Sequence, residues 1–209
     1  MIKKDEIIEI LDILKDKYPD ADCALDHRNN FELICAVALS AQTTDKSVNL
    51  VTPELFKKYP DAFALSKANT SDVEEIIRHI GMYRQKAKNL IGMSGELVNR
   101  FNGEVPGDYD SLVSLPGVGR KTANVVLAVG FGEQRIPVDT HVFRVANRIG
   151  IANAKDVLET ELQLMESIPE FRWTEAHHSI IFHGRQICHA KKPECADCPI
   201  NEKCIYFNQ

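Results

Sequence analysis

Apolar residues recur along most of the chain at the three- and four-residue spacing of an amphipathic helix. In residues 5–17, for example, Ile7, Leu11 and Leu14 fall on one stripe, with charged residues between them. Residues 31–39 are apolar nearly all round, which predicts a buried helix. No segment shows the sustained alternation, bounded by hairpin turns, that β-strands require. The pattern therefore predicts an all-α fold.

The remaining predicted helices are separated by glycine, proline and short polar segments such as SAQTTD at 40–45. They cover residues 46–58, 71–79, 84–101, 108–114, 120–130, 141–149, 156–167 and 173–186. The last of them contains three histidines, whose spacing favours core or hydrogen-bonding roles over a metal site. The sequence contains no internal repeat, low-complexity tract or long linker.

The composition is that of a soluble globular protein, with 44% hydrophobic and 26% charged residues. A length of 209 residues fits one large domain or two small ones. No stretch approaches the roughly eighteen uncharged apolar residues of a membrane span. The N-terminal segment scatters charges among its apolar positions, unlike a signal peptide. We therefore expect a cytoplasmic protein.

The net charge of −5 at first argues against a nucleic-acid partner. A phosphate contact, however, needs only a local basic patch. Residues 78–100 carry five basic side chains against one acidic, and residues 118–148 carry five against two. Solvated helix faces would explain either cluster, so the charge pattern permits DNA binding without showing it.

Four cysteines near the C-terminus, Cys188, Cys195, Cys198 and Cys204, are spaced C-x6-C-x2-C-x5-C. Thiolates this close repel one another unless a cation gathers them, so the spacing predicts a metal site. Disulfides are not expected in a chain without an export signal. Zinc ribbons usually pair two short cysteine knuckles, whereas only one short pair occurs here. The spacing favours an iron–sulfur cluster and leaves zinc open.

The loop between the first two of these cysteines has the sequence HAKKPE, with Lys191 and Lys192 at its tip. A metal site that fixed both ends of the loop would hold these ammonium groups rigidly, as a phosphate contact requires. A loop that only improves solubility explains the two lysines equally well.

Residues 108–130, DYDSLVSLPGVGRKTANVVLAVG, predict two helices joined by a tight turn. Pro116 ends the first helix, and Gly117 and Gly119 flank Val118 in the turn. The glycines let a DNA backbone approach closely, and free N–H groups at the start of the second helix point toward a phosphate. The segment therefore predicts a helix–hairpin–helix that binds DNA without reading its sequence. A plain turn between helices is the alternative.

Lys121 falls in the first turn of the second helix of this hairpin. The helix macrodipole there favours the neutral amine, and partial burial would act in the same direction. A neutral amine is a nucleophile that can form a Schiff base. A lysine that contacts phosphate, or is merely solvated, is the other interpretation.

Asp139, followed by Thr140, has the position of an N-cap for the next helix. A ten-residue helix advances about 15 Å. The eight-residue segment FGEQRIPV can span roughly 25 Å, enough to bring Asp139 back beside Lys121. A carboxylate facing the amine could stabilise a cationic sugar or accept a proton. Taken alone, Asp139 is explained by capping.

In this order, the hairpin, the lysine, the aspartate and the cysteines closely resemble the bacterial endonuclease III family. That family consists of bifunctional DNA glycosylases and abasic-site lyases for oxidised pyrimidines. The resemblance runs essentially from end to end. Its segments are LSAQTTD at 39–45, GMYRQKAKNL at 81–90, NGEVP at 102–106, LPGVGRKTANVVL at 115–127, VDTHVFRVANRIG at 138–150 and HGRQIC at 183–188. The cysteine spacing is that of the family's 4Fe-4S cluster, which implies iron–sulfur rather than zinc.

The resemblance implies a two-lobed, all-α helix–hairpin–helix DNA glycosylase fold. Residues 23–133 would form a six-helix barrel lobe, and residues 1–22 with 134–209 would form the iron–sulfur lobe. Lys121 and Asp139 would lie in a DNA-binding cleft between the two lobes.

The resemblance also implies a reaction. The damaged nucleotide is extruded from the duplex, Lys121 attacks its sugar, the base leaves, and β-elimination from a Schiff base cleaves the strand. Gln42 matches the residue that fills the vacated stack, and Met82 matches a wedge position usually taken by leucine or an aromatic residue. His141 matches a residue near the DNA backbone. The expected partner is double-stranded DNA with damaged bases or abasic sites, bound by a monomer associated with the nucleoid.

Two other functions fit part of the pattern. The adenine-excising mismatch glycosylase of the same superfamily lacks the nucleophilic lysine, uses a carboxylate near the position of Gln42 and carries an extra C-terminal domain. Lys121 disfavours it, as does a chain that ends five residues after Cys204. A non-catalytic helix–hairpin–helix module would not need Lys121 and Asp139 to converge.

Overall fold

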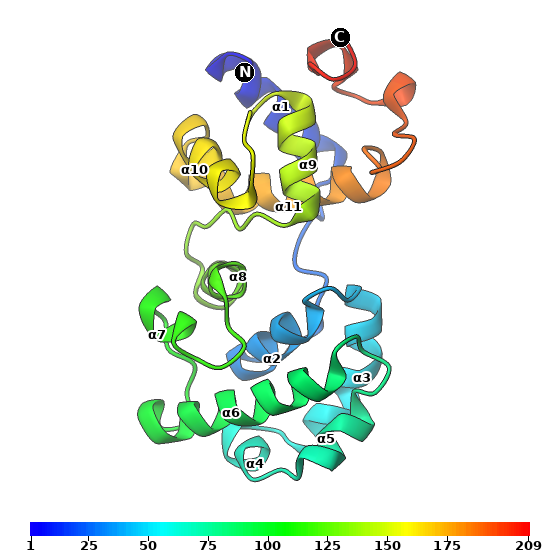
Figure 1. Ribbon diagram of the computed structural model, residues 1–209. Coiled ribbons are helices and arrows are strands. Elements are labelled where there is room, and N and C mark those ends of the chain that lie inside the picture. Colours follow the sequence, from blue (N-terminus) through cyan, green and yellow to red (C-terminus); the bar gives the residue numbers. More distant parts are fainter. The chain divides into compact units, whose positions relative to one another are not determined.

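The computed structural model describes all 209 residues and consists of helices joined by loops, without a β-strand (Figure 1). The prediction of an all-α fold is confirmed. The α-helices are α1 (Lys4–Lys17), α2 (Asn30–Ser40), α3 (Asp45–Lys58), α4 (Ala62–Ser66), α5 (Thr70–Ile76), α6 (Tyr83–Phe101), α7 (Tyr109–Val113), α8 (Arg120–Phe131), α9 (Thr140–Ile149), α10 (Val157–Ser167) and α11 (Trp173–Gln186). Three short 3₁₀ helices follow α10 and α11: η1 (Glu170–Arg172), η2 (Cys195–Asp197) and η3 (Asn201–Lys203). None of the helices combines the length and apolar character needed to cross a membrane.

The chain divides into two compact units. The first consists of Met1–Cys23 and Gln134–Gln209, and the second of Ala24–Glu133. The chain therefore leaves the first unit after α1, completes the second, and returns to the first with α9. The division predicted from the sequence differs only in the assignment of Cys23.

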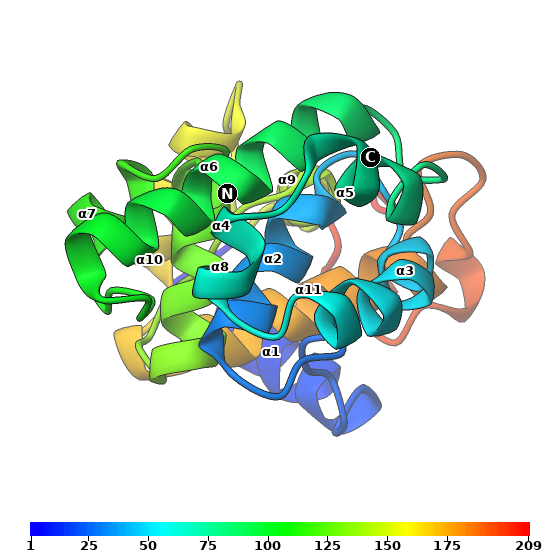
Figure 2. The ribbon, with the colours of Figure 1, turned by 90° about the horizontal axis from the view of Figure 1, so that it is seen from below.

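The second unit is organised around α2, which is buried on nearly every side, as its apolar sequence predicts. It contacts α3, α6 and α8, and α6 packs in turn against α4 and α5 (Figure 2). The short helix α4 was not among the six helices predicted for this unit. Asp61 begins it, because its carboxylate accepts a hydrogen bond from the Ala64 amide (2.8 Å).

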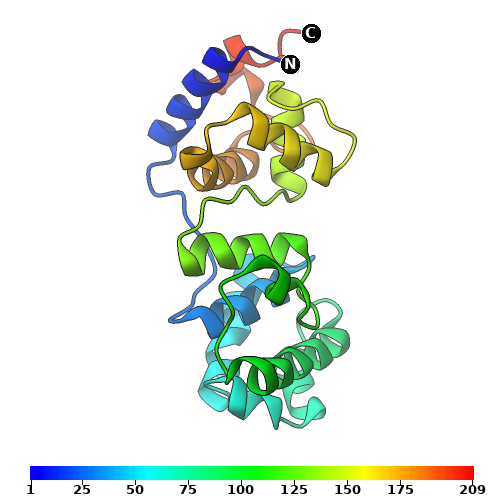
Figure 3. The ribbon, with the colours of Figure 1, turned by 90° about the vertical axis from the view of Figure 1, so that its left-hand side faces the viewer.

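The first unit has its core between α1, α9, α10 and α11, with fully buried side chains such as Leu14, Val142 and Ile180. Both chain ends attach to the C-terminal end of α9 (Figure 3). The Ile2 amide donates to the Gly150 carbonyl (3.0 Å), and the Ile205 amide donates to the carbonyl of the preceding Ile149 (3.1 Å). The first and last segments of the chain are thus both hydrogen-bonded to the end of α9.

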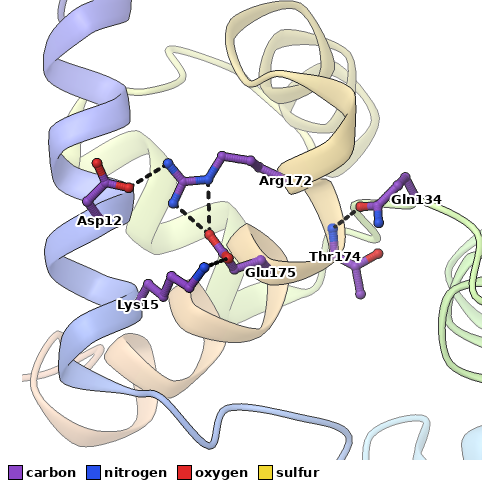
Figure 4. A network of polar contacts seen from close by, with 6 residues as sticks. All are labelled: Asp12, Lys15, Gln134, Arg172, Thr174 and Glu175. Atoms are coloured by element: carbon purple, nitrogen blue, oxygen red, sulfur yellow. Dashed lines mark hydrogen bonds and ion pairs between the residues drawn. The ribbon is translucent and has the colours of Figure 1, made fainter.

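A buried arginine at the end of η1 ties α11 to α1 (Figure 4). Arg172 donates to Asp12 (2.7 Å) and to Glu175 (2.6 Å), and Lys15 pairs with Glu175 at 2.7 Å. Burial opposes ionisation of Glu175, but the bonds from Lys15 and Arg172 outweigh it and lower the pKa of this carboxyl. The network holds α1 in the first unit although the second unit separates it in sequence from its partners.

Candidate functional site

The predicted hairpin is present between α7 and α8. Gly117 adopts a left-handed conformation, with φ of 78°. A Cβ atom there would lie 2.8 Å from the side chain of Asn89, so only glycine fits. Gly119, the N-cap of α8, has an ordinary φ of −96° and open space around its Cα. The N-cap of α8 makes no side-chain capping hydrogen bond.

Val118 differs from the two glycines that flank it. Its side chain is only 6% exposed, and its amide donates to the Leu115 carbonyl (3.1 Å). Both glycines are exposed. Val118 therefore anchors the turn, and the flanking glycines present its backbone to solvent.

Lys121 lies in the first turn of α8 with its side chain exposed, as the hairpin predicts. Its neighbour Arg120 reaches back to α7, where its guanidinium donates to the Tyr109 hydroxyl (3.4 Å) and lies 5.8 Å from the ring centroid. The lysine thus stands directly beside the exposed glycines of the turn.

Asp139 is the N-cap of α9, as predicted. Its Oδ1 accepts hydrogen bonds from the amides of His141 (2.8 Å) and Val142 (2.9 Å). Both capping bonds use the same carboxylate oxygen, so they hold the carboxylate of Asp139 at the start of the helix. Asp139 belongs to the first unit and Lys121 to the second, so their convergence stays a prediction.

Gln42 and Met82 lie on two adjacent exposed turns of the second unit. Both have left-handed backbones, with φ of 54° and 57°, which is uncommon for residues other than glycine. The turns approach so closely that a Cβ atom at Gly81 would lie 4.0 Å from the Gln42 carbonyl oxygen. The structure brings these two predicted DNA-contacting residues together.

His141 is half-buried in the first turn of α9. Its Nδ1 lies 3.2 Å from a guanidinium nitrogen of Arg144, which also donates to the Gly184 carbonyl (2.9 Å). Burial lowers the pKa of His141, and Arg144 acts in the same direction against the attraction of Asp139. The imidazole is therefore held beside the predicted catalytic carboxylate.

The four C-terminal cysteines line one pocket of the first unit. No disulfide joins them. Burial raises the pKa of the Cys198 and Cys204 thiols, and repulsion from the other cysteines acts in the same direction. No three of the protein's Cys, His, Asp or Glu side chains converge on a single metal-ion position.

Two side chains that the sequence did not assign to the cysteine site contact these cysteines. The Arg148 guanidinium donates to Cys188 Sγ (3.5 Å), and His183 Nε2 lies 3.6 Å from Cys198 Sγ. On the other edge of its ring, His183 Nδ1 lies 3.1 Å from the Tyr18 hydroxyl. His183 thus has the hydrogen-bonding role that the sequence favoured. Its partner Tyr18, which directly follows α1, is 165 residues away in sequence, so no local pattern could reveal the contact.

Arg148 also fixes the loop that carries the two exposed lysines. It donates to the carbonyls of His189 (2.6 Å) and Ala190 (3.0 Å), and its guanidinium stacks on the Tyr206 ring at 4.7 Å. Lys191 and Lys192 follow this fixed segment. Arg148 belongs to the basic segment 118–148, but nothing near it in the sequence indicates its contacts with the cysteine loop, which lies 40 or more positions away.

Comparison with known proteins places these features in a family. The model of the HhH-GPD superfamily base excision DNA repair protein matches residues 35–170. Endonuclease III of Bacillus subtilis (strain 168) is 48% identical over 205 residues, covering 98% of this chain and 94% of that protein. Endonuclease III of Escherichia coli (strain K12) is 42% identical over 205 residues, covering 98% and 97%.

Solved structures similar to this chain point to the same family. A structure described as a trapped endonuclease III–DNA covalent intermediate, an estranged-adenine complex, matches with a TM-score of 0.96 and 47% identity, over 100% of this chain and 98% of that chain. A thermostable thymine-DNA glycosylase, 22% identical with a TM-score of 0.87, shares the fold. With this similarity along nearly its whole length, the chain belongs to the HhH-GPD superfamily of base excision DNA repair proteins and, within it, to the endonuclease III family.

Proposed function

We propose that this chain is a DNA glycosylase and abasic-site lyase that removes oxidised pyrimidines from duplex DNA, with Lys121 as its nucleophile. The observation that carries the proposal is the exposed Lys121 amine in the first turn of α8, directly after the glycines of the hairpin. A lysine at this point reaches a sugar whose phosphate is held by the hairpin backbone. The similarity to an endonuclease III trapped covalently on DNA supports the same chemistry.

In this reaction Lys121 Nζ bonds to C1′ of the extruded nucleotide as the bond from C1′ to the base breaks. The base leaves with the electron pair and takes up a proton. Opening of the sugar ring gives the Schiff base, loss of a C2′ proton breaks the C3′–O bond, and hydrolysis frees the lysine. The lesion base is released first, and the strand is cleaved on its 3′ side.

Asp139 is the second catalytic residue in this proposal. Its capping bonds both use Oδ1, so Oδ2 is directed away from the first amides of α9 and is available to the substrate. A fixed carboxylate facing the sugar would stabilise positive charge that develops at C1′ and would accept a proton from the attacking amine.

DNA contacts are assigned to exposed groups of both units. Gly117, Gly119 and the first amides of α8 bind phosphate, and Gln42 and Met82 fill the space left by the extruded nucleotide. Further backbone contacts come from three residues of the first unit, His141, Lys191 and Lys192. Val118 supports the turn from within.

The four cysteines are proposed to hold a 4Fe-4S cluster. The residues fit such a group, because four cysteine thiols, the ligands that such a cluster takes, line one pocket. When bound, the cluster would crosslink the C-terminal segment, and the lyase reaction requires no electron from it. Arg148 and the cluster would then hold the loop of Lys191 and Lys192 from two sides.

We expect the protein to act as a monomer in the cytoplasm, on the DNA of the nucleoid. The test of the proposed function is base release and strand cleavage on duplexes that each contain one oxidised pyrimidine or one abasic site. Lys121→Gln should abolish strand cleavage, whereas Asp139→Asn, which keeps the shape of the cap, should bind DNA and lose most of its turnover. Adenine release from a mismatch by the unmodified protein, without strand cleavage, would contradict the proposal.

A further inference from the structure

A buried lysine lies beneath the two exposed turns that carry Gln42 and Met82. Lys86, on α6, is 6% exposed. Its Nζ donates to the carbonyls of Leu39 (2.9 Å) and Ala41 (2.7 Å) and to the Thr43 hydroxyl (2.9 Å). An ammonium group has three N–H bonds, and here each one has an acceptor.

The acceptors explain why a charge is tolerated at this place. The Leu39 and Ala41 carbonyls lie at the C-terminal end of α2, where a helix has unpaired carbonyls and a partial negative charge. Lys86 therefore caps α2 from a different helix. Burial lowers the pKa of Lys86, but only the protonated amine can donate to all three acceptors. The three acceptors therefore favour the protonated form of Lys86.

Two of these bonds, those to Ala41 and Thr43, flank Gln42. Ala41 and Thr43 are its neighbours in sequence, and both are held by the same ammonium group, so the left-handed backbone of Gln42 is fixed from both sides. Lys86 is also joined to the second turn, because its own amide donates to the Met82 carbonyl (3.0 Å). One residue thus connects the turns of Gln42 and Met82, which lie 40 positions apart in the sequence (82 − 42).

We propose that Lys86 is a positioning residue that holds Gln42 and Met82 together as one wedge for the vacated DNA stack. The inference rests on the proposed function, since it takes Gln42 and Met82 to be the residues that fill the stack. Lys86 itself is buried and touches neither DNA nor the reacting atoms. Its effect on the reaction passes through the turn between Ala41 and Thr43.

The test separates this role from a purely structural one. Single-turnover base release is measured on a lesion opposite its normal partner base and on the same lesion opposite an abasic site, where no base is left to be supported. Lys86→Met keeps the apolar stem and removes the three donors. It should slow release on the paired duplex by about tenfold or more, and much less on the unpaired one. A general loss of stability would slow both substrates equally.

Matched variants accompany this change. Lys88→Met alters an exposed lysine on the same helix and should leave the ratio of the two rates unchanged. Lys86→Arg retains donors and should recover part of the ratio. If Lys86→Met fails to fold, Thr43→Val removes one acceptor without changing the side-chain shape and should shift the ratio in the same direction by a smaller factor.

Three outcomes distinguish the inference from the proposed function. An altered ratio in Lys86→Met or Thr43→Val, matched by Gln42→Ala and Met82→Ala, supports it. An altered ratio in the Gln42 and Met82 variants alone overturns the role of Lys86 and leaves the proposed function intact. An unchanged ratio in all of them overturns both the wedge and the inference, while strand cleavage that depends on Lys121 would still stand.

Discussion

The two glycines of the hairpin allow its role in DNA binding to be separated from its role in folding. Gly119→Ala adds a methyl group where no atom lies within 4 Å and where φ is −96°, so the protein itself meets no clash or backbone strain. Alanine is a poorer N-cap than glycine by about 0.5–1 kcal/mol. The alanine also reduces the entropy of the unfolded chain, which stabilises the folded protein by roughly 0.4–1 kcal/mol and offsets the weaker cap. The free energy of unfolding should therefore change by less than about 1 kcal/mol.

The affinity of Gly119→Ala for DNA should change much more than its stability. If the backbone at Gly119 approaches a phosphate, the added methyl group prevents at least one hydrogen bond between an amide and a charged oxygen. Such a bond contributes about 1.5–3 kcal/mol. Loss of one bond therefore raises Kd by roughly 10- to 100-fold.

The assay combines urea unfolding with fluorescence anisotropy, using a duplex that contains an abasic-site analogue and an undamaged duplex of the same sequence. Gly117→Ala is the contrasting variant, because φ of 78° and the Asn89 side chain 2.8 Å away make it strained in the folded protein. The left-handed conformation alone costs about 1–2 kcal/mol with a Cβ atom. Gly119→Ala with normal stability and unchanged affinity for both duplexes would refute the assignment of the hairpin as a phosphate-binding turn.

Three further predictions follow from the structure. Lys191→Glu combined with Lys192→Glu should weaken binding to damaged and undamaged duplexes alike and should lower the salt slope of binding by about two in a salt titration; an effect on damaged DNA alone would contradict a backbone contact. Cys195→Ser should bleach the yellow-brown colour expected of the purified protein and lower its iron content and soluble yield, and stoichiometric zinc in a colourless wild-type protein would contradict the cluster. Burial opposes ionisation of Glu32, but hydrogen bonds from Arg28 outweigh it and lower the pKa. The stability that Glu32 contributes is therefore present above its unfolded-state pKa and lost as pH falls through its lower folded-state pKa, so acid unfolding curves of Glu32→Gln should fall less steeply.

Much of the local structure followed from sequence because its signals lie within a few residues. Asp139 stands immediately before an apolar-periodic segment, and capping by its side chain requires only the amides two and three residues further along. The glycines of the hairpin and the proline before them similarly favour a turn through their own backbone preferences, although Asn89 and Gly92 of α6 lie against it. Helix α4 was missed because its five residues are too short to show a period and, unlike the equally short α7, it is not followed by a recognisable hairpin turn, although Asp61 supplies its cap.

What the sequence did not reveal depends on contacts between distant segments. Nothing near Lys86 indicates that its ammonium group is buried against carbonyls 45 and 47 positions away. The same holds for the contact between Tyr18 and His183. Val118 is predicted to bind DNA with its neighbours, but that its side chain is buried could not be foreseen, because the pattern cannot tell which residue of a tight turn points into the protein. In each case tertiary packing decides the role of the side chain.

The central claim, that the Lys121 amine is the nucleophile, is tested most directly by chemical trapping. Borohydride added during reaction with a duplex that contains one abasic site should reduce the Schiff base and leave a covalent protein–DNA adduct. Peptide mapping should locate the adduct on Lys121, and Lys121→Gln should give none while it still binds an abasic-site analogue. An adduct that forms undiminished in Lys121→Gln, or that maps to the N-terminal amine or Lys46, would contradict the account.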